Sequence, residues 1–314
     1  MAQDYAKVLQ KLGRDFDVIG RSTASADQFE LASSHAVKQG GLSQALAVCA
    51  APEQAIVAVG IEQLATTAIE LINAGTHRLL LEKPGGLSSA EIGAIEVAAG
   101  KHGAEVLVAY NRRFYASTTL ARELIGQDGG ATSCIFEFTE WSHVIAPLVK
   151  ATGVKETWLL ANSTHVIDLA FHLCGFPKDW RAWHGGALDW HPSSARFCGS
   201  GITESGALFS YHADWEAPGR WGVEVLTRKR RLIFRPMEQL QVVLLGSVKI
   251  EQIEIDNQPD RQFKPGLLQQ VKAFLSEDDR FLCTIQQQLQ HCAVYDEMAG
   301  YNRQGSMPSL AAMS

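Results

Sequence analysis

Short apolar runs that alternate with helical patterns determine what the first third of this chain can fold into. The runs are residues 55–59, 79–81 and 106–110, and residues 64–74 and 88–99 between them repeat apolar side chains at helical spacing. Apolar runs of this length, bounded by turn residues, are typical of strands buried on both faces. Strands that alternate with helices predict βαβ units and therefore a right-handed parallel sheet.

The pattern changes after about residue 130, where an antiparallel sheet is expected. Residues 132–140 alternate like a strand with one solvated face, and a helical pattern follows at 163–174. The later β-like runs are residues 182–190, 206–213, 222–226, 231–234 and 241–245. Closing helices are expected at 267–275 and 284–301. These runs predict an α+β unit built on a large, mainly antiparallel open sheet.

The fold class is therefore α/β, with two domains. We predict a Rossmann-type dinucleotide-binding domain at 1–115 and an α+β substrate-binding and oligomerisation domain at 116–314. The first domain is incomplete at its start, since no strand carrying G-x-G-x-x-G precedes the helix at 2–12. We expect the true start to lie upstream of Met1; the alternative is a protein that lacks part of its pyrophosphate cradle.

Composition excludes several classes of function. The net charge of −6 argues against a nucleic-acid partner, and no apolar run approaches the roughly 20 residues that span a bilayer. The N-terminus lacks the features of a signal peptide. The six cysteines form no C-x-x-C pair, which argues against a zinc cage or a disulfide framework, so we expect no metal and a cytoplasmic location.

Lys83 is the first candidate catalytic residue. It follows an apolar strand and precedes Pro84, which cannot donate to a sheet, so the strand must end there. Open α/β sheets bind ligands at the carboxyl ends of their strands, and a partly desolvated lysine there can act as an acid or base near neutral pH. The alternative for a lone lysine is a solvated loop residue.

Two further segments join this one. Residues 109–114 contain the polar cluster Asn111-Arg112-Arg113 directly after a predicted strand, and residues 162–172 carry His165 and Asp168 in a predicted helix. Together with Glu82-Lys83-Pro84, their order and spacing resemble the Gfo/Idh/MocA family, the glucose–fructose oxidoreductase and inositol dehydrogenase group. The resemblance covers nearly the whole chain except the absent first strand.

The resemblance implies roles for individual residues. Lys83 matches the lysine that contacts both the substrate hydroxyl and the nicotinamide ribose, and His165 matches the histidine that exchanges a proton beside it. Asn162 and Asp168 share a helix face with His165, which makes them candidate substrate ligands. From its residue type, Arg112 is a further candidate: it could hold a substrate phosphate or carboxylate, and the alternative is that it braces the two domains.

Four positions are expected at the cofactor in the same comparison. They are Val59, Gly60, Glu82 and Asn111, and Lys83 contacts the cofactor as well as the substrate.

The chain departs from the family pattern at two places. Many members carry an acid four residues before the histidine, where this chain has Ala161, and Asn162 is the nearest polar substitute. An asparagine cannot accept a proton, so the acid–base work falls on Lys83 and His165. After the strand at 55–59 the usual proline and histidine are also replaced, by Gly60 and its neighbours.

Cofactor preference follows from the end of the strand at 16–19. NAD-specific folds place an acid there for the ribose 2′-hydroxyl, whereas this chain has Arg21, Ser22 and Thr23. An arginine with hydroxyls suits a 2′-phosphate, so we predict NADP in preference to NAD. The alternative is an exposed turn arginine.

The substrate is expected to be a carbohydrate. Trp141 and His143 cluster after the strand at 132–140, and an aromatic face with flanking donors suits a sugar ring, although an exposed strand end explains them nearly as well. We therefore predict an NAD(P)-dependent oxidoreductase acting on a sugar or sugar derivative, in a homo-oligomer formed by sheet packing. The alternatives are a non-catalytic or regulatory descendant with impaired cofactor binding, and a lyase or epimerase that uses a tightly bound nicotinamide transiently.

Overall fold

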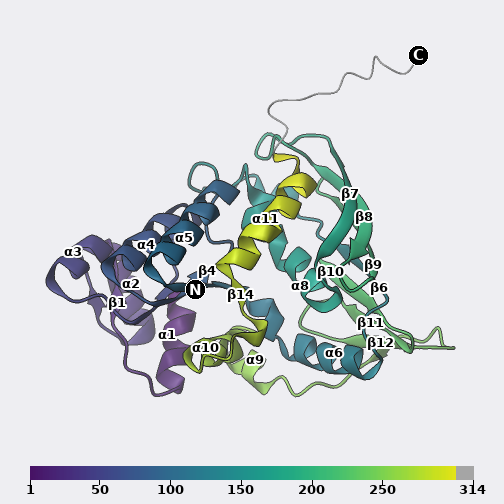
Figure 1. Cartoon of the computed structure of the whole chain (residues 1–314), viewed down its shortest axis with the longest axis horizontal. Coiled ribbons are helices and arrows are strands. Elements are labelled where there is room, and N and C mark those ends of the chain that lie inside the picture. Colours follow the sequence, from purple (N-terminus) through teal and green to yellow (C-terminus); the bar gives the residue numbers. More distant parts are fainter. Residues whose placement is uncertain (302–314) are drawn as a thin grey trace, which may run out of the picture.

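The computed structural model describes residues 1–301 and arranges them around two β-sheet regions (Figure 1). The N-terminal helices and short parallel strands form one side of the molecule, and a broad sheet forms the other. This is the predicted combination of a Rossmann-type parallel unit and a mainly antiparallel open sheet, so the predicted fold class is confirmed.

The parallel strands lie in two separate sheets. They are β1 (Val18–Ile19), β2 (Val37–Lys38), β3 (Gln54–Val57), β4 (Arg78–Glu82) and β5 (Glu105–Ala109). β1 pairs only with β2, whereas β3, β4 and β5 form a second sheet with β14 (Cys283–Thr284) as its antiparallel edge. Residues 79–81 are fully buried in β4, as expected for a central strand covered on both faces.

Helices cover these strands and have the expected end signals. They are α1 (Ala2–Lys11), α2 (Thr23–Ser33), α3 (Gly41–Val48), α4 (Ile61–Ala74) and α5 (Ser89–His102). The hydroxyl of Ser88 caps α5 by accepting from the Glu91 amide, and α4 ends at Gly75, whose positive φ of 106° favours glycine. The apolar faces of α4 and α5 pack together on the β3–β5 sheet.

The larger sheet has eight strands in the order β13-β12-β11-β10-β6-β9-β8-β7. Its strands are β6 (Ser133–Glu137), β7 (Pro177–Gly185), β8 (Arg196–Thr203), β9 (Leu208–Asp214), β10 (Gly222–Leu226), β11 (Arg230–Phe234), β12 (Gln241–Leu244) and β13 (Glu251–Gln252). β6 and β9 run parallel and every other neighbouring pair is antiparallel.

One face of this sheet is buried by α8 (Thr164–Cys174), which packs against β6 and β10. The remaining elements are η1 (Asn111–Phe114), α6 (Ala116–Gln127), α7 (Ser142–Ile145), η2 (Leu159–Ser163), α9 (Gln258–Gln262), α10 (Leu267–Leu275), η3 (Asp279–Phe281) and α11 (Ile285–Ala299). Helix α11 contacts α5 and β5 on one side and β7 and β8 on the other, so it joins the two sheet regions, as Figure 1 shows.

The C-terminal segment returns to the N-terminal side of the molecule. Helix α10 packs on α1, and its apolar residues share a core with Tyr5, Leu80 and Leu107. The domain limits of 1–115 and 116–314 stay a prediction, and residues 302–314 of that range lie outside the described residues.

Several of the secondary-structure predictions were wrong. Strand β8 and helix α6 were not expected, and the strand predicted at 182–190 is β7, which begins at Pro177 and ends at Gly185. The strand at 16–19 is limited to the two residues of β1. No helix in the described range is long and apolar enough to cross a membrane.

Candidate functional site

Lys83 lies at the carboxyl end of β4, where the strand pattern predicted it. Its Nζ donates a hydrogen bond to the backbone carbonyl of Ala161 in η2, so the lysine connects the two sheet regions. Burial lowers the pKa of Lys83 to about 8, and the nearby positive charge of Arg112 acts in the same direction against the opposing charges of Glu82 and Glu140. An amine with this pKa exchanges its proton near neutral pH.

His165 lies in the first turn of α8 and faces the same centre. Its ring meets Tyr110 edge-on, with ring centroids 6.4 Å apart, and lies 6.2 Å from the Trp221 ring. Burial lowers its pKa well below the ordinary histidine value, and the charges of Arg112 and Lys83 add to the effect. The imidazole is therefore neutral at pH 7, and its buried Nδ1 has no hydrogen-bond partner among the described residues.

Glu140 is a site residue that we did not predict. It lies just beyond β6 with 3% of its surface exposed, and its Oε1 accepts hydrogen bonds from Asn162 Nδ2 at 2.9 Å and Ser163 Oγ at 2.8 Å. Burial raises its pKa above the ordinary glutamate value, and the two hydrogen bonds oppose that rise. The signal for it in the sequence is its position as the last residue of the predicted strand at 132–140, directly before Trp141 and His143.

Alternating guanidinium groups and indole rings connect His165 with Trp141. The Cζ of Arg112 lies 5.0 Å from the Trp221 ring centroid, and the Cζ of Arg220 lies 5.3 Å from the same centroid and 4.6 Å from that of Trp141. All three are cation–π distances. Two nitrogen atoms, Nε of Arg112 and Nε1 of Trp221, are buried without a hydrogen-bond partner in the part of the chain described.

Trp141 and His143 border a cavity of about 840 Å³. The indole N–H of Trp141 donates to the Gly219 carbonyl at 2.9 Å, which fixes the ring while 45% of the residue stays exposed. Glu140 lines the same cavity. The cavity therefore adjoins the residue that binds Asn162, and it has the size of a small-molecule site.

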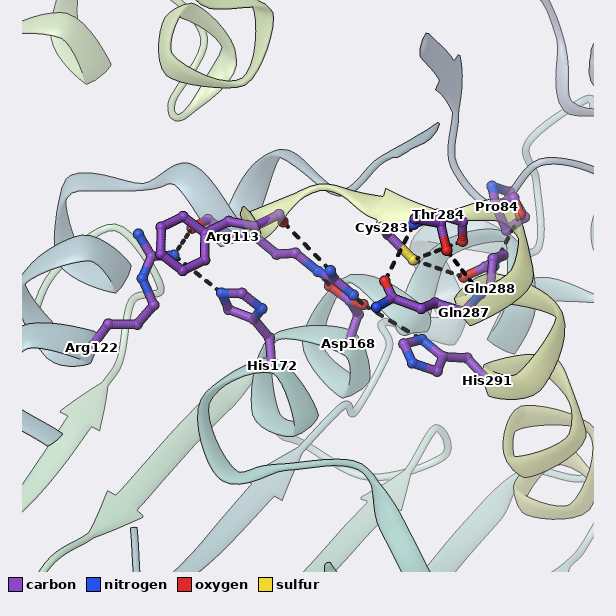
Figure 2. A network of polar contacts seen from close by, with 11 residues as sticks. Pro84, Arg113, Arg122, Asp168, His172, Cys283, Thr284, Gln287, Gln288 and His291 are labelled. Carbon is purple, nitrogen blue, oxygen red and sulfur yellow. Dashed lines mark hydrogen bonds and ion pairs between the residues drawn. The ribbon is translucent and has the colours of Figure 1, made fainter. Parts of the chain in front are cut away.

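Asp168 has a different partner from the one that we expected. Figure 2 shows its carboxylate against the guanidinium of Arg113, whose Nε donates to Oδ2 at 2.8 Å while Nη2 donates to Oδ1. Both side chains are buried, and this bidentate pair fastens η1 to α8. Both carboxylate oxygens of Asp168 are thus engaged by Arg113, although Asp168 shares helix α8 with His165, and the assignment of Asp168 to the substrate stays a prediction.

Cys283 and His291 approach the same carboxylate and form with it a group of metal-ligating types (Figure 2). Both Asp168 oxygens already accept from Arg113, so a metal ion there would lie against a second positive charge. Gln288 on the next turn of α11 donates to the Pro84 carbonyl at 3.0 Å, which ties the network to the end of β4. We interpret this group as a structural contact that holds η1, α8 and α11 together.

Two of the expected cofactor ligands are bonded within the protein. The hydroxyl of Tyr5 donates to Glu82 Oε1 at 2.7 Å, and the amide of Asn111 donates to the Pro265 carbonyl at 3.0 Å. Asn111 therefore fastens η1 to the segment before α10, and Glu82 fastens β4 to α1. Their assignment to the cofactor stays a prediction.

The other expected cofactor residues lie at the edges of the small sheets. Val59 and Gly60 are exposed directly before α4. Ser22 caps α2 by accepting from the Ser25 amide, and Thr23 donates to the Gln39 side chain at 3.1 Å. Arg21 is exposed beside them.

Comparisons with known proteins agree on the fold. No protein-family model matches the chain, and no curated protein sequence matches it significantly. Among solved structures, a levoglucosan dehydrogenase in complex with NADH and levoglucosan has a TM-score of 0.75 at 17% identity, covering 95% of this chain and 92% of that one. An NAD-binding oxidoreductase from Klebsiella pneumoniae has a TM-score of 0.75 at 16% identity, covering 95% and 93%.

A third similar structure is UDP-N-acetylglucosamine 3-dehydrogenase from Acidithiobacillus ferrooxidans, with a TM-score of 0.71 at 14% identity. It covers 95% of this chain and 93% of its own. At such identities the likeness concerns the fold, and it extends over both sheet regions. The chain therefore has the Gfo/Idh/MocA-type fold that its motifs resemble.

Proposed function

We propose that this chain is an oxidoreductase that moves a hydride between a nicotinamide and a hydroxyl-bearing carbon of a sugar or sugar derivative. The observation that carries the proposal is Lys83, a partly buried lysine with a pKa of about 8 that lies beside the neutral imidazole of His165. Oxidation of an alcohol releases a proton together with the hydride, so the site needs a base at the hydroxyl. A bound nicotinamide would supply the hydride acceptor.

The two residues would divide the work at the reacting oxygen. The neutral amine of Lys83 would accept the hydroxyl proton, and its protonated form would return the proton in the reductive direction. His165 remains neutral in this range, so it would hold the same hydroxyl by a hydrogen bond and orient its carbon. Tyr110 and Trp221 flank the imidazole and would hold its orientation.

The residues at this end of the site fit a nicotinamide and a polyol. His165 Nδ1, Arg112 Nε and Trp221 Nε1 are buried polar atoms without partners in the described chain, and polar ligands satisfy such atoms. A second observation concerns the helix motif: Ala161 stands where many members of the family that this chain resembles carry an acid four residues before the histidine. This second observation favours the alternative of a non-catalytic descendant with impaired cofactor binding.

Hydride-transfer assays decide between the enzyme and that alternative. We expect turnover with members of a panel of sugars and sugar nucleotides, followed by nicotinamide absorbance, and a roughly hundredfold loss in Lys83→Ala and His165→Ala. Lys101→Ala, an exposed lysine on α5, is the matched control. Near-normal turnover in both site variants contradicts the assignment. Product formation without net release of reduced nicotinamide favours the lyase or epimerase alternative.

We infer a preference for NADP over NAD from the turn after β1. Arg21 is exposed there without an ion pair to any residue in 1–301, and Thr23 lies next to it. A 2′-phosphate would gain a charge-assisted contact from this guanidinium. Titration with NADPH and NADH tests the preference, and tighter binding of NADH contradicts it.

A cytoplasmic location and a homo-oligomer remain part of the proposal. All six cysteines are free thiols, which supports a reducing compartment. Exposed apolar side chains on the outer face of the eight-stranded sheet support association through that face.

A further inference from the structure

The carboxylate of Glu140 has one oxygen fixed by the protein and one open to a ligand. Its Oε1 accepts from Asn162 and Ser163, whereas no donor within residues 1–301 bonds Oε2. Asn162 and Ser163 belong to η2, the same short turn whose Ala161 carbonyl accepts from Lys83. A carboxylate offers about four acceptor positions, so Glu140 keeps unused capacity beside the catalytic lysine.

Glu140 also supplies the type of group that is missing from the helix motif. The family pattern places an acid four residues before the histidine, and Ala161 occupies that position here. Glu140 comes from the end of β6 and is held against the neighbouring residue, Asn162. The charges of Glu140 and Lys83 influence each other, as expected for groups that share one site. The carboxylate is therefore present in this site but comes from another element.

The cavity that Glu140 lines is suited to a sugar ring. Trp141 presents a half-exposed indole to the cavity, and Trp190 and Trp215, which are buried and stack on each other at 5.6 Å with their rings 5° from parallel, form the wall behind it. Indole faces bind the C–H face of a sugar, while carboxylates accept from its hydroxyls. The volume of about 840 Å³ admits more than one ring.

The charged groups of the cavity lining are mostly acidic. Asp189 and Glu216 accompany Glu140, and His143 is the only basic type in the described lining. Two guanidinium groups lie beside this lining: the Cζ of Arg220 lies 4.6 Å from the ring centroid of Trp141, and Arg196 pairs with Glu216 at 3.9 Å. Like charges across a binding site oppose binding, so this lining disfavours a phosphate group and favours a neutral ligand or an ammonium group.

We propose that Glu140 is the substrate-binding carboxylate of this site and that its cavity selects neutral or amino sugars against sugar phosphates. Its Oε2 accepts a hydrogen bond from a hydroxyl next to the reacting carbon, while Asn162 and Ser163 hold Oε1. Glu140 transfers no proton in this scheme; it binds and orients the sugar at Lys83. The inference rests on the proposed function because it places the reacting carbon beside Lys83.

Direct binding of sugars to the protein tests this inference without a need for hydride transfer. The probes are glucose, glucosamine, cellobiose and glucose 6-phosphate, titrated calorimetrically and by tryptophan fluorescence. We expect saturable binding of a neutral or amino sugar, at least tenfold weaker binding of the phosphate, and roughly 10- to 100-fold weaker binding of the sugar to Glu140→Gln. Glutamine keeps one acceptor oxygen for Asn162 and Ser163 and replaces the other by a donor, so this variant should fold.

A control variant and a second measurement make the outcomes separable. Glu204→Gln removes an exposed carboxylate in the turn after β8 and should bind as the wild type does. Thermal unfolding of each variant confirms that the fold is intact. Binding that Glu140→Gln leaves unchanged, a phosphate that binds as tightly as its parent sugar, or no saturable binding of any probe overturns the inference. Binding that depends on Glu140 in a protein without hydride transfer overturns the proposed function and leaves this inference standing. Hydride transfer that depends on Lys83 but not on Glu140 supports the proposed function and overturns this inference.

Discussion

At the scale of single residues, the proton affinity of Lys83 controls the proposed reaction. Its pKa of about 8 results mainly from burial, which disfavours the charged amine, and Arg112 adds to that effect. The amine is therefore mostly protonated at pH 7 and mostly neutral at pH 9. A base must be neutral to accept a proton, whereas an acid must be protonated to donate one.

We therefore expect kcat/KM for sugar oxidation to rise with pH through an apparent pKa of about 8, because the neutral form of Lys83 increases. The reductive direction should show the opposite slope, since it uses the protonated form. Steady-state profiles in both directions measure this, with Lys101→Ala as the control. Profiles of Lys83→Ala should be flat in the same range. A wild-type profile that is flat around pH 8 contradicts a catalytic role for this amine.

The buried pair of Arg113 and Asp168 makes a second prediction at this scale. Asp168→Asn leaves a guanidinium buried without its charge partner, and breaking such a pair typically costs 3–5 kcal/mol, about the range that we expect here. Urea unfolding of the wild type and the variant measures the loss. The double variant Arg113→Met with Asp168→Leu should recover much of it, because no charge then remains buried. A loss under about 1 kcal/mol for Asp168→Asn would mean that water reaches the pair.

At the scale of elements, the sequence predicts those parts whose local pattern agrees with their burial. Residues 79–81 of strand β4 are apolar and buried on both faces, and α10 ends where its pattern predicts. Strand β8 was not predicted because Gly199 and Gly201 interrupt the alternation of its apolar and polar residues. Glycine weakens the intrinsic preference for a strand, and only the folded sheet shows why it is present.

Packing across the sheet requires both glycines. A Cβ at Gly199 would lie 2.4 Å from the Tyr211 ring, and one at Gly201 would lie 2.3 Å from the backbone oxygen of Asp179. Helix α6 was not predicted for a related reason. Its first turn is held by hydrogen bonds to residues outside the helix, from Ser117 to the Met237 carbonyl and from Thr118 to the Arg112 carbonyl. Glu140 belongs to the same class: it meets Asn162, 22 residues further along the chain, only after the sheet has formed.

Gly201→Ala tests this account of β8. The methyl group would overlap a backbone atom that cannot rotate away, so we expect a loss of about 1–3 kcal/mol in the free energy of unfolding. Gly185→Ala in the neighbouring strand β7 is the matched control, since a Cβ there meets nothing within 4 Å. Chemical denaturation compares the two. Equal stability of both variants would contradict the packing argument.

At the scale of the whole molecule, the eight-stranded sheet has one face covered by α8 and another that carries exposed apolar side chains. Trp183 on β7 is 60% exposed and Leu208 on β9 is 61% exposed, and Ile135 on β6 lies on the same outer face. An extended patch of this kind marks an interaction surface more often than a free one. The proposed catalytic centre and the Glu140 cavity involve different residues, so association through this face would leave the proposed site open.

We expect the protein to be a homo-oligomer that packs this outer face against a second copy, in agreement with the proposed role of the C-terminal sheet. Leu208→Glu places a charge on this face and should produce monomers, because a buried unpaired carboxylate opposes association. Leu31→Glu on α2, where the leucine is 89% exposed, controls for the added charge and should leave the assembly unchanged. Light scattering coupled to size-exclusion chromatography gives the mass of each variant. A wild-type protein that is monomeric at micromolar concentration, or an oligomer that Leu208→Glu does not dissociate, would locate any assembly elsewhere on the molecule.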